Sequence, residues 1–145
     1  MLPTIYLIRH GVTKANVEQI IAGGNFETDL LEEGVRQAKE AGVWLKDKGI
    51  KSIYGSTLKR VRQTIEAMNL PSEIPISYDS RLKEMGFAEY EGTDFRKIPE
   101  HLRLDRMFEN RELRRGSGEN VRELCQRVSE FIEEKVRGLS APVLL

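Results

Sequence analysis

The sequence is poor in the residues that build metal centres and disulfide bonds. It contains one cysteine and two histidines among 145 residues. One cysteine excludes an internal disulfide, and this set is too small for the usual tetrahedral zinc site. The sequence therefore predicts no metal site and no cofactor, and its cysteine usage is typical of a reducing cytoplasm. We expect the lone cysteine, Cys125, to be a small core residue of an amphipathic helix.

The sequence also lacks long apolar runs and a net charge. No stretch approaches the roughly 20 apolar residues of a membrane span, and Met1–Thr4 leads into a strand pattern without the basic segment or cleavage site of a signal peptide. The 23 basic residues equal the 23 acidic ones, which argues against nucleic acid or a membrane surface as a partner. We expect a cytoplasmic protein in which locally clustered arginines attract any anionic substrate.

Periodicity along the chain predicts one α/β domain over residues 1–145. Apolar runs typical of buried strands alternate with stretches of helical periodicity. The predicted strands are Ile5–Ile8, Ile50–Tyr54, Ile74–Tyr78 and Pro142–Leu145. The predicted helices are 13–21, 29–48, 56–68, 99–110 and 121–138. Such alternation is typical of a three-layer α/β fold, in which helices cover both faces of a mostly parallel sheet.

Polar residues at the predicted helix starts are candidate caps. We expect Thr13 to cap the first helix, Asp29 to open the second with a capping box, and Ser56 or Thr57 to cap the third. At the other end of the second helix, Gly49 suits the left-handed conformation that commonly ends a helix.

The tripeptide Arg9-His10-Gly11 directly follows the first predicted strand. In open α/β sheets, ligands bind at the carboxyl ends of the strands. An arginine there can hold a phosphate in a bidentate grip, a histidine can attack phosphorus, and a glycine lets the backbone turn and approach closely. Three residues alone are equally compatible with a strand that ends in two polar surface residues, so the later segments decide between these interpretations.

Four ordered blocks of the sequence support the functional interpretation. Arg9–Asn16 matches Arg-His-Gly-x-Thr-x-x-Asn in full, and Ser56–Thr64 matches Ser-x-Leu-x-Arg-x-x-x-Thr. Leu82–Gly92 contains Leu-x-Glu, a Gly-Phe pair and Tyr-Glu-Gly, and Gly116–Asn120 loosely matches Gly-Gly-Glu-Ser. In these blocks the chain resembles the histidine phosphatase superfamily, in its phosphoglycerate mutase-like branch.

The resemblance implies that His10 attacks the phosphorus of a phosphate ester and forms a phosphohistidine, which water then hydrolyses. Phosphoryl transfer needs cations around the equatorial oxygens, and Arg9 and Arg60 are the candidates. Asn16 is a candidate neutral donor to the same phosphate, and backbone amides near Gly23 are further candidates. The implied activity is the metal-independent hydrolysis of a small phosphorylated metabolite.

Glu84 is the candidate general acid and base. It would protonate the leaving alkoxide and later deprotonate the attacking water, a role that requires partial burial of its carboxyl group. The nearby Glu89, Glu91 and Glu119 are competitors for the role, and we expect each of them to be structural. The second histidine, His101, has no supporting motif, and we expect it at the surface or at a helix start.

Four arginines outside the main blocks allow two interpretations. They are Arg81, Arg111, Arg114 and Arg115. They are candidates for contacts with distal anionic groups of a substrate, but clustered charges usually form a solvated surface. The sequence does not decide between these two possibilities.

The sequence departs from the family pattern at its carboxyl end. In the family the last strand runs on into a Ser-His-Gly motif with a second essential histidine, whereas this sequence ends at Leu145. We therefore expect a domain that is truncated relative to the family, with an incomplete last strand. The alternatives to hydrolysis are phosphoglycerate mutase-type transfer, non-catalytic binding of phosphate esters or of a partner protein, and a fragment of a longer product. A homodimer that pairs the open strand edge is a further alternative.

Overall fold

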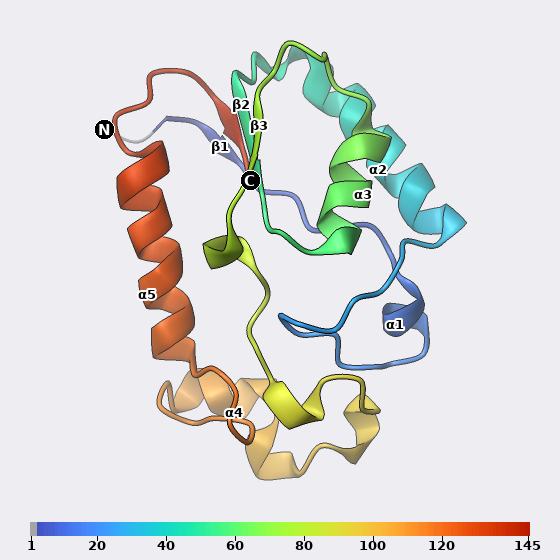
Figure 1. Ribbon diagram of the computed structural model, residues 1–145, viewed down its shortest axis with the longest axis vertical. Coiled ribbons are helices and arrows are strands. Elements are labelled where there is room, and N and C mark those ends of the chain that lie inside the picture. The colour runs from blue at the N-terminus through green and yellow to red at the C-terminus, as the bar shows by residue number, and fades with distance from the viewer. Residues whose placement is uncertain (1–2) are drawn as a thin grey trace.

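Four short parallel strands form the sheet at the centre of the computed structural model, which describes residues 3–145 (Figure 1). The strands are β1 Ile5–Tyr6, β2 Ser52–Gly55, β3 Ile76–Tyr78 and β4 Val143–Leu144. They lie in the order β1-β4-β2-β3, and each pairing is parallel. The predicted parallel sheet is therefore confirmed, with the last strand between the first and the second.

Helices cover both faces of this sheet. Helices α2, Glu32–Leu45, and α3, Lys59–Met68, lie on one side of it, and α5, Val121–Phe131, lies on the other (Figure 1). The short helices α1, Lys14–Val17, and α4, Leu104–Glu109, lie below the sheet in this view. Single turns of 3-10 helix occur at Lys46–Lys48, Ser80–Leu82, Ala88–Tyr90, Phe95–Lys97 and Glu100–Leu102, and a π-helical turn follows α5 at Ile132–Val136. The predicted three-layer α/β architecture is confirmed.

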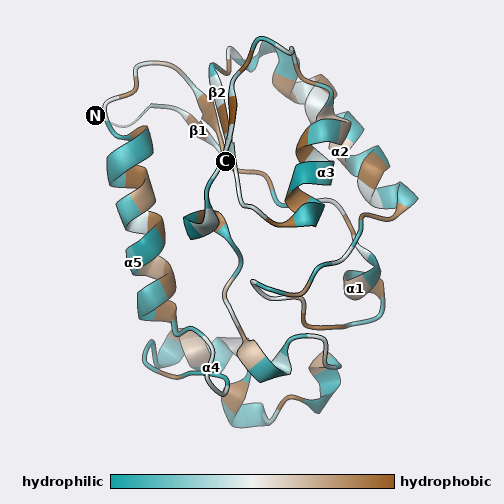
Figure 2. Cartoon of the chain, in the orientation of Figure 1, coloured by the Kyte–Doolittle hydropathy of each residue, from teal (hydrophilic) through white to brown (hydrophobic). Residues whose placement is uncertain are grey.

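Apolar side chains form separate clusters around the sheet. The strands are largely hydrophobic, whereas each long helix carries both hydrophobic and polar residues (Figure 2). The cluster toward α2 and α3 buries Ala38, Leu45, Ile50, Ile53, Ile65, Met68 and Leu144, and the cluster toward α5 buries Phe131, Val136 and Val143. A third cluster buries Ile21, Met85, Phe87, Ile98, Met107 and Val121. Because Met85 and Phe87 belong to it, this third cluster anchors the loop that follows β3.

The central strand β4 fixes the register between β1 and β2. Leu144 of β4 pairs with Tyr6 of β1 on one side and with Ile53 of β2 on the other. The segments that leave β1 and β2, which contain His10 and Ser56, therefore start from the same edge of the sheet. This is the carboxyl edge, where parallel sheets bind ligands.

The first predicted helix is shorter in the structure than the sequence suggests. Thr13 does cap α1, since its Oγ1 accepts a hydrogen bond from the Asn16 amide (3.3 Å). The helix nevertheless ends at Val17 rather than at residue 21, because Gln19 takes a left-handed conformation (φ 58°).

Asp29 does not cap α2, contrary to the prediction. The N-cap residue is Leu31, which makes no side-chain capping bond. The Asp29 carboxylate instead accepts a hydrogen bond from Gln63 (2.8 Å) and pairs with Lys59 (2.7 Å), both on α3. The local sequence predicts that Asp29 caps α2, but in the structure its carboxylate binds residues of α3 instead.

The predicted cap of α3 is also wrong. Its N-cap residue is Leu58, and neither Ser56 nor Thr57 caps it. The Ser56 side chain is buried, 4% exposed, and its hydroxyl has no hydrogen-bond partner among residues 3–145. This places Ser56 with the site rather than with the helix.

Two predictions on the second half of the chain are wrong. The helix expected over 99–110 is two short pieces, because Arg103 between them is extended (ψ 156°). Cys125 is exposed rather than buried, since the residues that α5 buries are its two ends, Val121 and Phe131. Within residues 3–145, no helix is both long and apolar enough to cross a membrane.

Candidate active site

The blocks singled out in the sequence converge at the carboxyl ends of β1 and β2. Two cavities meet there, and Arg9 and His10 line both. The first, of about 490 Å³, lies between the segments after β1 and β2 and includes Ser56. The second, of about 510 Å³, extends toward α1 and the loop after β3, and includes Asn16 and Glu84. The structure therefore brings four of the predicted site residues to one place.

A hydrogen bond to the backbone of the next residue holds the His10 ring in one orientation. Its Nδ1 lies 2.8 Å from the carbonyl oxygen of Gly11. A carbonyl can only accept a hydrogen bond, so Nδ1 carries the proton and donates it. In the neutral ring, Nε2 is then unprotonated and its lone pair is available as a nucleophile.

The surroundings of His10 favour this neutral ring. Burial of the half-buried side chain lowers the pKa of His10 from its ordinary value of 6.5, and the positive charges of Arg60 and Arg9 lower it further. The hydrogen bond to Gly11 and the negative charge of Glu84 act in the opposite direction, with a smaller effect overall. The histidine is thus an uncharged base at neutral pH, set among cations that would attract a phosphate.

Close backbone packing holds the turn after β1 in place. A Cβ atom at Gly11 would overlap the carbonyl oxygen of Gly34 on α2, so no larger residue fits there. The Gly11 amide donates to Oγ1 of Thr64 (3.2 Å), which in turn donates to the carbonyl of Arg60 (2.7 Å). This chain of contacts ties the residue after His10 to both α2 and α3.

Arg60 is fully buried, 0% exposed, and its guanidinium links three parts of the site. It donates to the carbonyl oxygens of Phe26 (3.1 Å) and Gly23 (2.7 Å) and to the carboxylate of Glu84 (3.0 Å). Arg60 is therefore not a solvated residue of α3. Its charge acts on His10 from behind the cavity wall, since Arg60 itself lines neither of the two cavities.

Glu84 lies at the cavity wall with its carboxylate partly exposed. The side chain is 43% exposed, and one oxygen accepts the bond from Arg60. The side chain is thus exposed, and the partial burial expected for the acid-base role is not found. Glu84 lines the second cavity together with His10.

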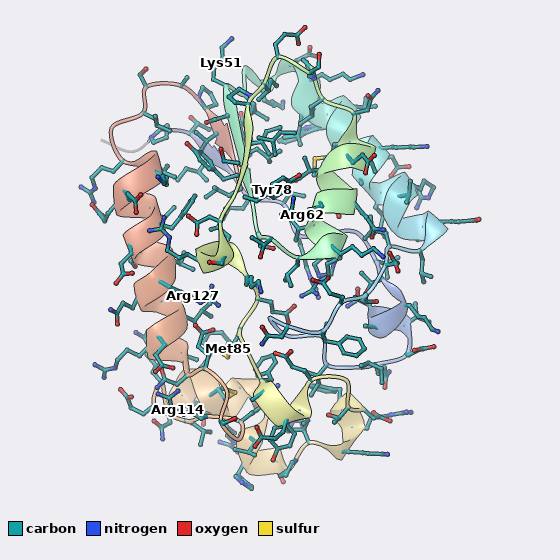
Figure 3. The ribbon with its side chains drawn as sticks, viewed as in Figure 1. Lys51, Arg62, Tyr78, Met85, Arg114 and Arg127 are labelled. Carbon is teal, nitrogen blue, oxygen red and sulfur yellow. The ribbon has the colours of Figure 1, made fainter. Side chains whose placement is uncertain are left out.

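The backbone of Glu84 is held by α5. Arg127 on α5 donates to the carbonyl oxygens of Arg81 (2.6 Å) and Glu84 (3.3 Å), and Figure 3 shows its side chain beside the loop that contains Met85. Glu119 pairs with Arg127 (2.6 Å) and keeps the guanidinium in this orientation. Glu119 thus has a structural role, as predicted from the sequence.

Glu91 joins the two loops that flank the cavities. Its carboxylate accepts hydrogen bonds from the amides of Gly24 (3.0 Å), Asn25 (2.9 Å) and Phe87 (2.9 Å). Gly23 takes a left-handed conformation (φ 57°) against this carboxylate, and any Cβ there would overlap it. The loop geometry therefore requires glycine at position 23, while its role in phosphate binding stays a prediction.

Asn16 lines the second cavity. Its Oδ1 accepts from both the backbone amide and the hydroxyl of Thr13 (2.9 Å each). Since the oxygen is engaged at the cap of α1, Nδ2 is the group left to donate to a ligand. Arg9 is exposed and lines both cavities, so it too can reach an anion there.

The sequence does not reveal the roles of two residues and leaves the role of a third open. Local pattern assigns Ser56 to a helix cap, although it is a buried, unpartnered hydroxyl on the first cavity. Thr64 enters only as part of a motif, without its link to Gly11. For Arg115 the sequence leaves open a solvated surface or a contact with a substrate anion, and the structure places this residue on the second cavity. The available signals for Ser56 are its position directly after a strand and its place at the start of the Ser-x-Leu-x-Arg motif.

These features define a three-layer α/β protein with a histidine and arginines in a cleft at the carboxyl edge of its sheet. The sequence pattern of the "Histidine phosphatase superfamily (branch 1)" matches residues 5–144. The chain therefore belongs to the histidine phosphatase superfamily, as its motifs predict.

Proteins with curated descriptions support this assignment. "Fructose-2,6-bisphosphatase TIGAR" of Bos taurus is 37% identical over 90 residues, which cover 59% of this chain and 33% of that protein. "Probable phosphoglycerate mutase GpmB" of Shigella dysenteriae serotype 1 is 32% identical over 136 residues, which cover 89% of this chain and 61% of that protein. The chain thus spans between a third and about three fifths of the length of these relatives.

Solved structures show the same fold. The protein TTHB049 of Thermus thermophilus superposes with a TM-score of 0.79 at 26% identity, covering 97% of this chain and 75% of that chain. Bacillus stearothermophilus YhfR gives a TM-score of 0.78 at 28% identity, covering 98% and 73%. The predicted phosphoglycerate mutase-like fold is confirmed by these neighbours.

Proposed function

We propose that this chain carries a phosphoryl-transfer site and hydrolyses a small phosphate ester through a phosphohistidine at His10, without a metal ion. The observation that carries the proposal is the hydrogen bond from His10 Nδ1 to Gly11, which leaves Nε2 free at the junction of two arginine-lined cavities. Membership of the superfamily, with relatives named as a phosphatase and as a mutase, supports it.

In the first proposed step, Nε2 of His10 forms a bond to phosphorus as the bond to the ester oxygen breaks. Glu84 gives its proton to the departing alkoxide. In the second step, Glu84 removes a proton from water, whose oxygen attacks phosphorus while the P–N bond breaks and releases free histidine and phosphate. Arg9 and Asn16 hold the equatorial oxygens, and Arg60 stabilises their charge from behind the wall.

A second hydroxyl could replace water as the acceptor. The match to a protein named as a probable phosphoglycerate mutase over 89% of this chain favours this variant of the same chemistry. Hydrolysis and transfer share the first step and differ only in the acceptor, so product analysis separates them.

The test is hydrolysis of an aryl phosphate by the full chain in excess chelator. We expect phosphate and phenol to be released in equal amounts, at a rate that the chelator does not change. Phenol released with less free phosphate, and phosphate found on an added alcohol, would identify transfer. A folded sample that binds phosphate but releases neither product would show a binding protein and contradict the proposal.

We expect the loss of activity in Glu84→Gln to depend on the leaving group of the substrate. For an alkyl phosphate, kcat/KM should fall by about 10²- to 10⁴-fold, because the alkoxide then leaves without a proton. For 4-nitrophenyl phosphate, the fall should be much smaller, since nitrophenolate leaves unprotonated. Glu89→Gln is the matched control and should change neither rate appreciably, because the Glu89 carboxylate is bonded to Ser117 instead. Equal losses of Glu84→Gln on both substrates would contradict the acid role.

The pH profile reports the state of His10. Only the neutral ring has a nucleophilic Nε2, so protonation of His10 removes activity as the pH falls. Because burial and two arginines lower the pKa of His10 below 6.5, we expect the acid limb of kcat/KM to have its midpoint below pH 6.5. A midpoint at or above pH 6.5, or an acid limb that disappears in Glu84→Gln, would assign this limb to a different group.

A further inference from the structure

One buried arginine in the second cavity differs from the other arginines of its sequence region. Arg81 pairs with Asp79 and Glu134 (2.7 Å each), and Arg114 pairs with Glu123 through two bonds of 2.6 Å. Arg115 is only 2% exposed and, among the ion pairs found within residues 3–145, pairs with no carboxylate.

The groups that hold Arg115 within the described part of the chain are neutral. Its Nε donates to the carbonyl oxygen of Leu102 (2.6 Å), and its guanidinium lies 4.4 Å from the ring centre of Phe87. Its Nη2 is buried without a hydrogen-bond partner among the described residues. A buried cation without an anion is costly, and one carbonyl and one ring compensate for only part of that cost.

The cavity that Arg115 lines also contains the reacting groups. His10, Arg9 and Glu84 lie on the same cavity of about 510 Å³, a volume in the range of small-molecule sites. Another cation on its wall, Arg96, is bound to Asp94 (2.6 Å) and is 70% exposed. Arg115 is therefore the strongly desolvated cation that is still available to a ligand whose phosphate lies at His10.

We propose that Arg115 binds a second anionic group of the substrate, a carboxylate or a second phosphate, and so makes the site selective for doubly anionic phosphate esters. The inference rests on the proposed function, because it takes the transferred phosphate to lie at His10. A second anion would supply the hydrogen-bond acceptor that Nη2 lacks, and planar guanidinium groups hold both carboxylates and phosphates well.

The test is equilibrium binding by calorimetry, which needs no turnover. The probes are methyl phosphate, phosphoglycolate and ethylene glycol bisphosphate, each with the full chain. We expect the doubly anionic probes to bind at least about tenfold more tightly than methyl phosphate, since a hydrogen bond to a charged group commonly contributes that much. The tighter of the two identifies the second group as a carboxylate or a phosphate.

Variants assign the preference to Arg115. Arg115→Met should remove most of the preference and leave the affinity for methyl phosphate within about twofold, while Arg115→Lys should keep part of it. Arg114→Met is the matched control and should bind all three probes as the wild type does. If Arg115→Met does not fold, Arg115→Lys and the wild-type preference still decide the matter.

Two results would overturn the inference. One is a wild-type protein that binds the three probes equally, and the other is an Arg115 variant that folds and keeps the full preference. Failure of the proposed function looks different. A protein that prefers the doubly anionic probes but hydrolyses no ester supports the role of Arg115 and contradicts only the hydrolysis.

Discussion

Replacing Arg60 with alanine should lower the free energy of unfolding by about 3–5 kcal/mol. The substitution leaves the carbonyl oxygens of Gly23 and Phe26 buried without their donor and opens a cavity where a fully buried side chain was. It also releases the Glu84 side chain and the loop that contains Gly23 and Phe26. Urea unfolding of the two proteins measures the difference.

Arg62 supplies the matched control on the same helix. It is exposed, and its guanidinium stacks 3.9 Å from the ring centre of Tyr78, a pair labelled in Figure 3. Arg62→Ala should cost about 1 kcal/mol or less. Arg60→Lys should lie between the two alanine variants, because lysine keeps the charge but not the fork that reaches three acceptors. If Arg60→Ala costs no more than Arg62→Ala, Arg60 does not organise the site.

Replacing His10 with alanine should lower kcat/KM for phosphate ester hydrolysis by about 10³-fold or more, because the step that makes the P–N bond is then lost. The variant should remain folded, since the half-buried side chain makes a single hydrogen bond within residues 3–145, to the adjacent Gly11. Steady-state kinetics and a thermal melt on the same sample separate loss of chemistry from loss of structure.

The second histidine of the chain gives the control for this variant. His101 is exposed, lies in a single 3-10 turn and lines neither of the two cavities. His101→Ala should leave kcat/KM within about twofold, as surface substitutions far from a site commonly do. A large loss for His101→Ala, or a small one for His10→Ala, would mean that the nucleophile has been assigned to the wrong residue.

The fold could be predicted because its signals are local. The apolar run at Ile5–Ile8, the helical periodicity of α2 and α3 and their strict alternation with strands are all visible in the sequence. The cap at Asp29 could not be predicted, because Lys59 and Gln63, about thirty positions away, compete for the same carboxylate. A capping pattern reports what a side chain can do locally, and tertiary partners decide what it does.

The same distinction holds for the site. Motif spacing identifies His10 and Glu84 as candidates, and the structure places both on one cavity. Glu91 links two loops that lie more than sixty positions apart in the sequence. This contact could not be predicted, because the sequence around Glu91 does not indicate so distant a partner. The burial of Arg115 is equally hidden, because a run of charged residues looks the same in sequence whether its members face solvent or a cavity.

The central claim is that His10 accepts the phosphoryl group, and mass spectrometry of the protein quenched during turnover tests it most directly. We predict one added phosphoryl group on the peptide that contains His10, stable in base and lost in mild acid, and absent from His10→Ala. Turnover that continues with His10 unmodified, or a phosphoryl group that persists in His10→Ala, would contradict the account.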